Sequence, residues 1–326
     1  MDMEFDILSM LADGKFHSGE DIATAFGITR ASVWKKIHKL QSDCQLKIDA
    51  VTGKGYRIPG GIDLLNKDRI ERYLKEQDTV IGSIELFHCA ESTNQYLLDL
   101  ADTRQSGIQC CLAEMQTNGR GRRGRQWVSP YGKSIYLSLS NWLNMAMHEL
   151  SGLSLVVGVA VAETLHNTGL TDIALKWPND LHVNEKKLGG ILLELQGEAQ
   201  GPVRVVLGLG LNMDLPMDIK QQIDQPVTDV KSHLKQLPSR SKLVSQIISN
   251  IAEKLRIFEQ QGLVPFIDSW NQFDLYIGLP VSVISTSYNV KGIYRGINQA
   301  GELILETDKG IKVCNAGEVS LRKSDA

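Results

Sequence analysis

Near its middle the chain reads Gly119-Arg120-Gly121-Arg122-Arg123-Gly124-Arg125-Gln126-Trp127. Glycine inside a regular element costs stability and a buried arginine needs a partner, so this stretch predicts a mobile loop. Its guanidinium groups suit bidentate binding of a carboxylate or phosphate. Taken alone, the stretch is better explained as a solvated basic loop.

The same stretch contains the spacing Gly119-x-Gly121-x-x-Gly124, which is that of a dinucleotide-binding turn. Such a turn needs an apolar helix directly after it. Here the chain continues with Arg125–Pro130, and the proline falls where the helix would run. We therefore reject a Rossmann fold.

Two further polar motifs follow downstream. They are Lys176-Trp177-Pro178-Asn179-Asp180 and Lys187-Leu188-Gly189-Gly190. Together with the arginine-rich loop they indicate an enzyme that handles an anionic nucleotide intermediate.

Composition limits the class of protein. The chain has 326 residues, 42% of them apolar, which is enough for a sizeable core and for two or three domains. A net charge of −3 confines nucleic-acid binding to a local surface. The five cysteines lack CxxC or zinc-ligand spacing and predict reduced, mostly buried thiols of a cytoplasmic protein. The acidic N-terminus is no signal peptide, and the apolar run 153–162 is too short to span a bilayer, so no membrane partner is expected.

Residues 1–64 predict a winged helix-turn-helix DNA-binding domain. Ser18 and Thr29 are good N-caps for a second and a third helix. The third helix holds Val33, Trp34, Ile37 and Leu40, and residues 46–58 read as a β-hairpin with a glycine-rich tip. A basic helix that is merely solvated is the alternative. The predicted DNA-binding residues are Ser18, Thr29, Arg30, Ser32, Lys35, Lys36 and Lys54.

Residues 65–275 predict an α+β domain with a mixed or antiparallel sheet, so the fold class is α+β multidomain. Helices are expected at 153–165 and 243–258, and strands at 135–139, 190–195 and 203–208. Residues 276–326 switch to short β segments at 281–284, 291–297, 303–306 and 317–321, with a turn at 308–310, which fits a small β-barrel.

With Gly208-Leu-Gly-Leu-Asn212 added, the motifs resemble the signature series of biotin–protein ligases. The N-terminal winged helix makes the chain similar to the bifunctional form that also represses the biotin operon, the BirA family. The resemblance implies ATP- and Mg²⁺-dependent activation of biotin to biotinyl-5′-AMP, and transfer to a lysine of the biotin carboxyl carrier protein of acetyl-CoA carboxylase. It further implies an SH3-like C-terminal barrel, operator DNA as a partner, biotinyl-5′-AMP as co-repressor and a homodimer on adenylate binding.

The resemblance also assigns residues to roles. Lys187, Arg120 and Arg122 would neutralise the reacting anions, and Asp180 would orient the acceptor lysine. The biotin site would comprise Ser92, Thr93, Gln116, Gly119, Arg120, Arg122, Trp127, Lys187, Gly190 and Gly208. The nucleotide site would comprise Arg122, Arg125, Lys176, Asn179, Asn212 and Arg322, and no protein metal site is expected.

Simpler roles compete at several of these positions. Ser92 or Thr93 could be only the N-cap of the helix 94–100, and Trp127 could be ordinary core. Gly208 and Gly210 would let the ligand lie against a strand edge, or would mark a bulge. Asp180 could be a plain turn residue.

One position departs from the family pattern. Val227 stands where an aromatic side chain usually stacks on adenine. The loss of this stacking weakens adenylate binding by roughly 1 kcal/mol beyond the effect of buried area. Two other functions stay open. A lipoate–protein ligase would use a similar fold, although Ser92, Thr93 and Gln116 favour a ureido ring. A biotin-sensing transcription factor with a degenerate ligase domain is disfavoured by the intact Lys187 and Asp180.

Overall fold

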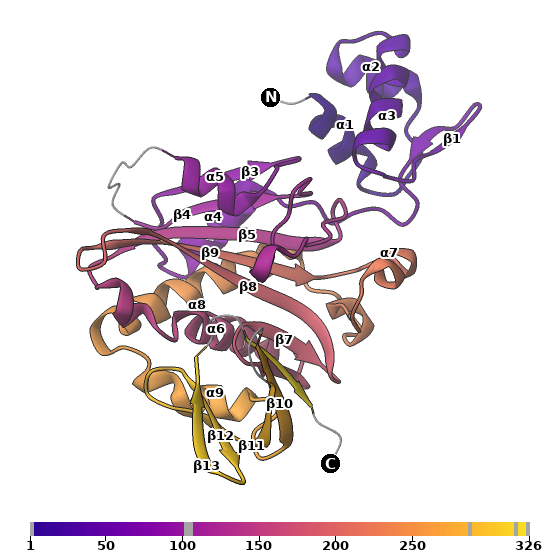
Figure 1. The fold of residues 1–326 in the computed structure, drawn as a ribbon. Helices are drawn as coiled ribbons and strands as arrows, with labels where there is room; N and C mark the ends of the chain where they lie inside the picture. Colours follow the sequence, from indigo (N-terminus) through magenta and orange to yellow (C-terminus); the bar gives the residue numbers. More distant parts are fainter. Residues whose placement is uncertain (1–2, 101–106, 286–288, 316–318, 324–326) are drawn as a thin grey trace.

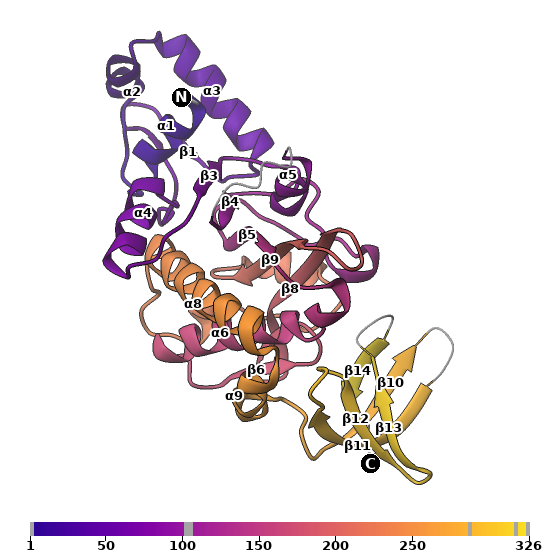
Figure 2. The same cartoon turned by 90° about the vertical axis from the view of Figure 1, so that its left-hand side faces the viewer.

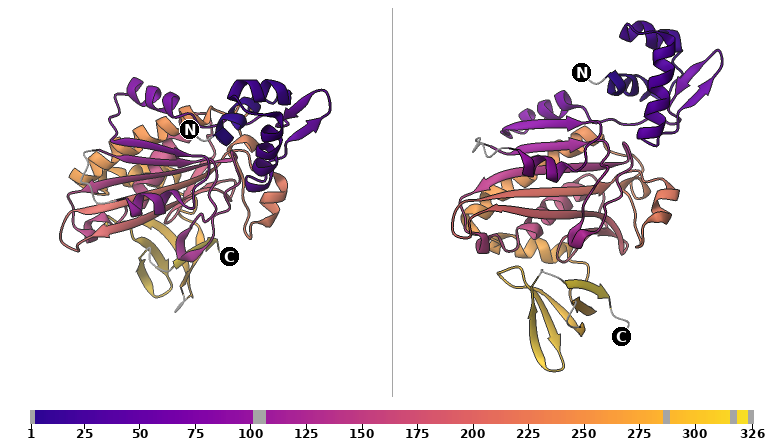
Figure 3. Two further views of the ribbon diagram at one scale, coloured as in Figure 1. Left: turned by 90° about the horizontal axis from the view of Figure 1, so that it is seen from above. Right: turned by 45° about the horizontal axis from the view of Figure 1, so that its top comes forward.

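The computed structural model describes residues 3–100, 107–285, 289–315 and 319–323. A small helical unit lies at one end, a seven-stranded sheet in the middle and a smaller sheet at the other end (Figure 1; Figure 3, right). The chain runs through these parts in order, from indigo to yellow.

The N-terminal unit is the expected winged helix. It comprises α1 (Met3–Leu11), α2 (Gly19–Phe26), α3 (Arg30–Asp43) and the antiparallel pair β1 (Asp49–Val51) and β2 (Gly55–Arg57). Ser18 Oγ accepts a hydrogen bond from the Asp21 amide, and Thr29 Oγ1 accepts one from the Ser32 amide. Both predicted N-caps are therefore confirmed.

Trp34 does not lie on the buried face of α3. Val33, Ile37 and Leu40 are buried, but the Trp34 side chain is 51% exposed and packs on the ring of His38, with ring centroids 4.0 Å apart. Residues at i, i+4 and i+7 share a helix face, and Trp34 is displaced from that stripe by one residue. The tryptophan therefore belongs to the outer surface of α3.

The central sheet has seven strands in the order β3-β4-β5-β9-β8-β7-β6, parallel between β3 and β4 and antiparallel elsewhere. The predicted mixed sheet is thus confirmed. Its strands are β3 (Ser83–Phe87), β4 (Gln109–Ala113), β5 (Ser134–Leu143), β6 (Ile173–Lys176), β7 (Asp180–Val183), β8 (Lys186–Gly197) and β9 (Val203–Asn212).

Alternation along β9 divides the sheet into two faces. Leu207, Leu209 and Leu211 belong to the main core, whereas Val206 packs with Leu97 of a separate cluster around α5. The core face carries α6 and α8 side by side, with α4 and α9 (Figure 2). The helix bounds are α4 (Lys67–Glu76), α5 (Thr93–Asp99), α6 (Leu153–Asn167), α7 (Met217–Gln222), α8 (Arg240–Gln261) and α9 (Ile267–Phe273).

The apolar segment Met147–Asn167 is longer than the run identified from sequence. Its 21 residues meet the length and composition of a membrane span, but 67% of its apolar window is buried inside the protein. The segment includes α6, which packs on the sheet and on α8. Its apolar character is therefore that of a core helix.

The C-terminal unit is a five-stranded antiparallel sheet in the order β13-β12-β11-β10-β14, which corresponds to the expected small β unit. Its strands are β10 (Pro280–Ser285), β11 (Asn289–Ile297), β12 (Leu303–Thr307), β13 (Gly310–Cys314) and β14 (Val319–Lys323). The expected strand 317–321 begins at 319 instead, with 317 and 318 outside the described residues. β13 was missed, because only its Cys314 is buried while Ile311 and Val313 are exposed.

Packing is continuous between neighbouring units. Tyr131, from the segment before β5, belongs to the winged-helix core, and its hydroxyl lies 2.8 Å from His88 Nδ1. His88 Nε2 in turn lies 3.5 Å from the Cys44 sulfur at the end of α3. Leu64 packs on the winged-helix core and Leu65 belongs to the central core. Division of the chain at 64/65 and at 275/276 remains a prediction.

A buried ion pair fastens the connection between the first two units. Arg240 Nη1 lies 2.7 Å from Glu114 Oε2, and the two side chains are 2% and 0% exposed. Arg240 also donates to the Asp63 carbonyl, and Glu114 accepts from the Leu65 amide. One arginine at the start of α8 thereby holds the linker against the sheet.

Candidate functional site

A cavity of about 430 Å³ opens on the sheet face that carries α5. Its lining comes from β6 to β9, from the arginine-rich loop and from the C-terminal sheet. Fourteen of the sixteen residues predicted for catalysis or for biotin and nucleotide binding line it; Gly119 and Asn212 do not. The lining members are Ser92, Thr93, Gln116, Arg120, Arg122, Arg125, Trp127, Lys176, Asn179, Asp180, Lys187, Gly190, Gly208 and Arg322.

Hydroxyl and amide groups gather at one end of the cavity. Ser92 Oγ accepts from the Gln95 amide, so Ser92 does cap α5. The backbone amide of Thr93 donates to Gln116 Oε1 at 2.9 Å, and its hydroxyl donates to the same oxygen at 3.1 Å. Gln116 is therefore fixed, and its side chain lines this end of the cavity.

Asn94 belongs to the site but was not predicted. It is buried, lines the cavity and donates to Glu194 Oε2 at 2.8 Å. A Cβ on Gly208 would collide with the Asn94 amide. The glycine thus makes room for a neighbouring side chain. Asn94 could have been found from the sequence, because it belongs to the polar run Ser92-Thr93-Asn94 and Gly208 leaves space in the facing strand.

The arginine-rich loop is more ordered in the structure than expected. A bridge joins Arg120 to Gln126, and residues Arg122–Gly124 form a 3₁₀ turn. The Arg120 guanidinium lies 3.1 Å from the Glu194 carboxylate, a partner that sequence reasoning missed. Gly119, at the start of the loop, packs so closely that an added Cβ would collide with the Trp127 carbonyl oxygen. The loop is therefore a closed turn.

Arg122 connects the loop to the second motif. Its Nη1 donates to Asn179 Oδ1 at 3.1 Å, while Asn179 Nδ2 donates to the Ile191 carbonyl at 2.7 Å. Burial lowers the pKa of Arg122, and the charge of Asp180 opposes this shift. Arg122 still carries its charge at neutral pH, because an arginine pKa starts above 12.

Trp127 and Lys187 meet at the centre of the cavity. A Cβ on Gly210 would collide with the indole of Trp127, and Lys187 Nζ lies 5.5 Å from the ring centroid. The same Nζ lies 2.7 Å from Asp180 Oδ1. Gly208 and Gly210 mark neither a bulge nor an edge strand, since β9 is an inner strand in unbroken register with β5 and β8. Both glycines line the cavity, and their predicted contact with the ligand stays a prediction. The space above these two glycines is taken by Asn94 and Trp127.

The other end of the cavity carries positive charge. Lys176 Nζ lies 5.9 Å from the Tyr276 ring centroid, and burial lowers the pKa of Lys176. Arg322 and Lys323 reach the cavity from β14. This end suits an anion such as a phosphate.

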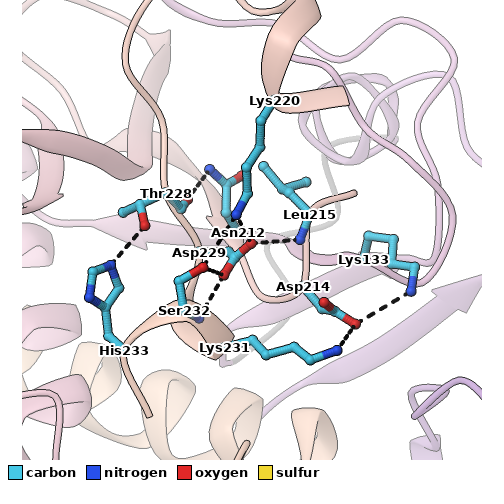
Figure 4. Close-up of polar contacts among 10 residues, drawn as sticks. All are labelled: Lys133, Asn212, Asp214, Leu215, Lys220, Thr228, Asp229, Lys231, Ser232 and His233. Carbon is cyan, nitrogen blue, oxygen red and sulfur yellow. Dashed lines mark hydrogen bonds and ion pairs between the residues drawn. The ribbon is translucent and has the colours of Figure 1, made fainter. Parts of the chain in front are cut away.

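A strap of residues 224–228 crosses Lys187. The Lys187 amide donates to the Pro226 carbonyl, and the Thr228 amide donates to the Lys187 carbonyl, both at 2.9 Å. Asp224, Gln225 and Pro226 line the cavity, whereas Val227 does not. Asn212 is buried and donates to the Thr228 carbonyl at 3.0 Å, so its side chain supports the strap (Figure 4). Its predicted nucleotide contact stays a prediction.

Asp229, the residue after the strap, holds it in place through the bonds of its carboxylate. Its carboxylate, 3% exposed, accepts from the amides of Leu215 and Ser232 and lies 2.6 Å from Lys220 Nζ (Figure 4). The segment with Leu215 and Lys220 and the segment with Ser232 are thus both bonded to one carboxylate. No local sequence pattern predicts this arrangement, because the donors come from α7, from Leu215 and from Ser232.

We expect Asp229→Asn to lower the free energy of unfolding by roughly 2–3 kcal/mol, because charge-assisted hydrogen bonds are lost and an NH₂ group faces amide donors. Amide exchange at Lys187 and Thr228 should accelerate. Urea denaturation and hydrogen exchange measure the two effects. Asp224→Asn, at an exposed position of the same strap, is the matched control and should change neither.

Comparison with known proteins places these features in a family. Residues 86–212 match the biotin/lipoate A/B protein ligase family, 4–57 an HTH domain, and 276–322 the biotin protein ligase C-terminal domain. The chain is 39% identical over 319 residues to the bifunctional ligase/repressor BirA of Salmonella typhimurium, covering 98% of this chain and 97% of that one. It is 29% identical over 315 residues to the BirA protein of Bacillus subtilis, covering 95% of each.

A solved structure of the biotin protein ligase from Aquifex aeolicus, in complex with biotin and ATP, superposes with a TM-score of 0.63. It shares 28% identity and covers 74% of this chain and 99% of that chain. Fold and site therefore define a protein ligase domain joined to a winged helix. The chain belongs to the BirA family of bifunctional biotin ligase/repressors.

Proposed function

We propose that this protein activates biotin with ATP and transfers it to a lysine of the biotin carboxyl carrier protein of acetyl-CoA carboxylase. One observation carries the proposal: a single cavity joins a hydroxyl-and-amide end to a cationic end, with Lys187 between them. The first end suits the ureido ring of biotin and the second suits the phosphates of ATP. The cytoplasm, where the carrier and ATP occur, is the proposed location.

In the first step the biotin carboxylate attacks the α-phosphorus of ATP and pyrophosphate leaves. The two reactants are both anions, so neighbouring cations must lower their repulsion. Lys187 lies at the junction of the two ends, and Arg122 is fixed beside it through Asn179. The loop that carries Arg122 would cover the mixed anhydride and keep water out.

In the second step the amine of the carrier lysine attacks the acyl carbon and AMP leaves. Asp180 is paired with Lys187 in the structure. We infer that Lys187 turns to the adenylate phosphate once it has formed, which frees the Asp180 carboxylate to receive the acceptor amine. The predicted role of Asp180 thus belongs to the second step.

Magnesium fits this site as an ion that arrives with ATP. The described residues contain no cluster of three or more histidine, cysteine or acidic side chains suited to hold a metal. Mg²⁺ commonly uses one carboxylate with phosphate and water oxygens. Asp224, exposed at the cavity, would supply that carboxylate. The bound ion would neutralise charge on the polyphosphate.

Incubation with labelled biotin, ATP and an unmodified carrier domain tests the enzyme function, with lipoate as the matched acid. Label on the carrier from biotin alone supports the proposal. Label from lipoate would favour a lipoate ligase, and binding of biotin without transfer would leave a sensor with a degenerate ligase domain.

We further propose that the winged helix binds operator DNA and that biotinyl-5′-AMP is the co-repressor. Thr29, Arg30, Lys35 and Lys54 are exposed on this unit. Lys36 is less exposed and lies 3.5 Å from Glu4 of α1. Ser18, Thr29 and Ser32 also take part in the helix caps described above. The outer surface of α3, which now includes Trp34, would enter the major groove.

Arg30→Ala and Lys35→Ala should each weaken operator binding and reduce the slope of log K against log salt by about one unit. Fluorescence anisotropy with labelled operator, repeated over a range of salt, gives the slope. Lys39→Ala is the control, because Lys39 is engaged with Glu4 at 3.1 Å. Equal slopes for all variants and the wild type would argue against this surface.

One winged helix makes few contacts, so repression would use two of them on a two-fold operator. We propose that the adenylate promotes a homodimer through the open edge of the central sheet and that the carrier competes for this surface. β3 is a terminal strand, whereas the β6 edge already pairs at Leu175 with Asp274. Sedimentation equilibrium with and without biotinyl-5′-AMP, then with carrier added, tests this scheme. Unchanged self-association would remove the co-repressor role and leave the ligase role intact.

A further inference from the structure

His182 is a buried histidine on the cavity side of β7. Alternation along this strand puts Leu181 and Val183 into the main core and leaves Asp180 and His182 on the opposite face. The His182 side chain lines the cavity and is 5% exposed, and neither ring nitrogen makes a well-formed hydrogen bond among the described residues, although a weaker backbone interaction with Glu185 is present. It was not among the predicted site residues.

The ring is neutral at physiological pH. Burial lowers the pKa of His182 to about 4, and the charge of Lys176 acts in the same direction while Asp180 opposes it. A neutral imidazole has one N–H donor and one acceptor nitrogen. A buried ring nitrogen without a well-formed hydrogen bond costs free energy. A ligand in the cavity would relieve that cost.

The surroundings of His182 select an anion. Lys176 and Lys187 flank it, and Arg322 reaches the same end of the cavity from β14. The carboxylates of Asp180 and Glu185 also line the cavity here, but the cations outnumber them, so a phosphate group would be attracted. The ureido ring would be held at the far end, beside Thr93 and Gln116.

We propose that His182 is a substrate-contact residue that donates an N–H hydrogen bond to a phosphate oxygen of ATP. The proposal rests on the function proposed above and extends it to one more residue. The imidazole holds the polyphosphate without transferring a proton, while biotin oxygen replaces pyrophosphate on the α-phosphorus. Lys176 and Lys187 attract the phosphate through their charge, and the His182 hydrogen bond fixes its orientation.

The test compares His182→Phe, which removes both nitrogens, with His182→Gln, which keeps a donor. kcat/KM for ATP, measured by pyrophosphate release, should fall roughly 10- to 100-fold in His182→Phe and less in His182→Gln. The KM for biotin should not change. Transfer from preformed biotinyl-5′-AMP to the carrier should retain the wild-type rate. Loss of transfer alone would overturn the proposal in favour of a role with the acceptor lysine, and equal loss of both half-reactions would indicate a structural role.

Two further measurements separate this proposal from the ligase assignment and from misfolding. Calorimetry with pyrophosphate alone should show weaker binding to His182→Phe than to wild type, whether or not biotin is a substrate. In wild-type protein, the NMR signals of the His182 ring should shift on addition of pyrophosphate and not on addition of biotin. Unchanged signals with bound pyrophosphate would contradict the contact even if the variants failed to fold.

Discussion

Lys187→Ala is expected to slow the formation of biotinyl-5′-AMP by roughly 100- to 1,000-fold while the fold stays intact, because a pre-organised charge contact to the reacting anions is lost. Lys187 Nζ is held by Asp180 at the junction between the two ends of the cavity. Arg122→Ala should have an effect of similar size. Pyrophosphate release under single-turnover conditions measures it.

Lys186→Ala is the matched control, because Lys186 is the exposed neighbour on the same strand. It should release pyrophosphate at the wild-type rate. If Lys187→Ala and Arg122→Ala also release pyrophosphate at nearly that rate, their assignment to catalysis is lost. Removal of Lys187 also leaves Asp180 without its partner, so thermal unfolding of each variant must accompany the kinetics.

Arg240→Met is expected to lower the free energy of unfolding by about 3–5 kcal/mol. Glu114 would stay buried without its arginine partner, and the linker would lose the hydrogen bond to the Asp63 carbonyl. Urea denaturation gives the change. Arg295→Ala, which removes an exposed ion pair with Glu306, should cost less than about 1 kcal/mol.

The double variant Arg240→Met/Glu114→Leu separates charge from packing. Replacing both partners of a buried pair by apolar groups is often close to neutral. Here part of the loss should remain, since the Leu65 amide also needs the Glu114 carboxylate. A double variant as unstable as Arg240→Met would show that the buried charge is not the cause.

Elements with a local pattern were predictable from the sequence. The caps Ser18 and Thr29, the antiparallel strands around Gly197–Gly201 and the long helix α8 are confirmed, because capping and periodicity act over a few residues. The strand β13 was missed, and the exposure of Trp34 was not predicted, for the opposite reason. Whether an apolar residue next to a helix stripe is buried, or a half-exposed segment pairs as an edge strand, depends on distant neighbours.

The candidate site was predictable only where motifs are contiguous. Arg122, Asn179 and Lys187 come from such motifs, and the structure brings them to one cavity. Glu194, Asp229 and His182 carry no local signal. Their importance arises from hydrogen bonds, burial and charge contributed by strands and loops far away in sequence.

The shared core of the central and C-terminal sheets limits how this protein can be recombined. Leu303, Leu305 and Tyr294 of the C-terminal sheet belong to the same core as α6, and the Trp177 indole donates to the Gly301 carbonyl between β11 and β12. Arg322 extends from this sheet into the cavity. The last fifty residues therefore cannot be exchanged with those of a relative as an independent cassette. A chimera would need matching changes around Trp177 to retain both its stability and its nucleotide end.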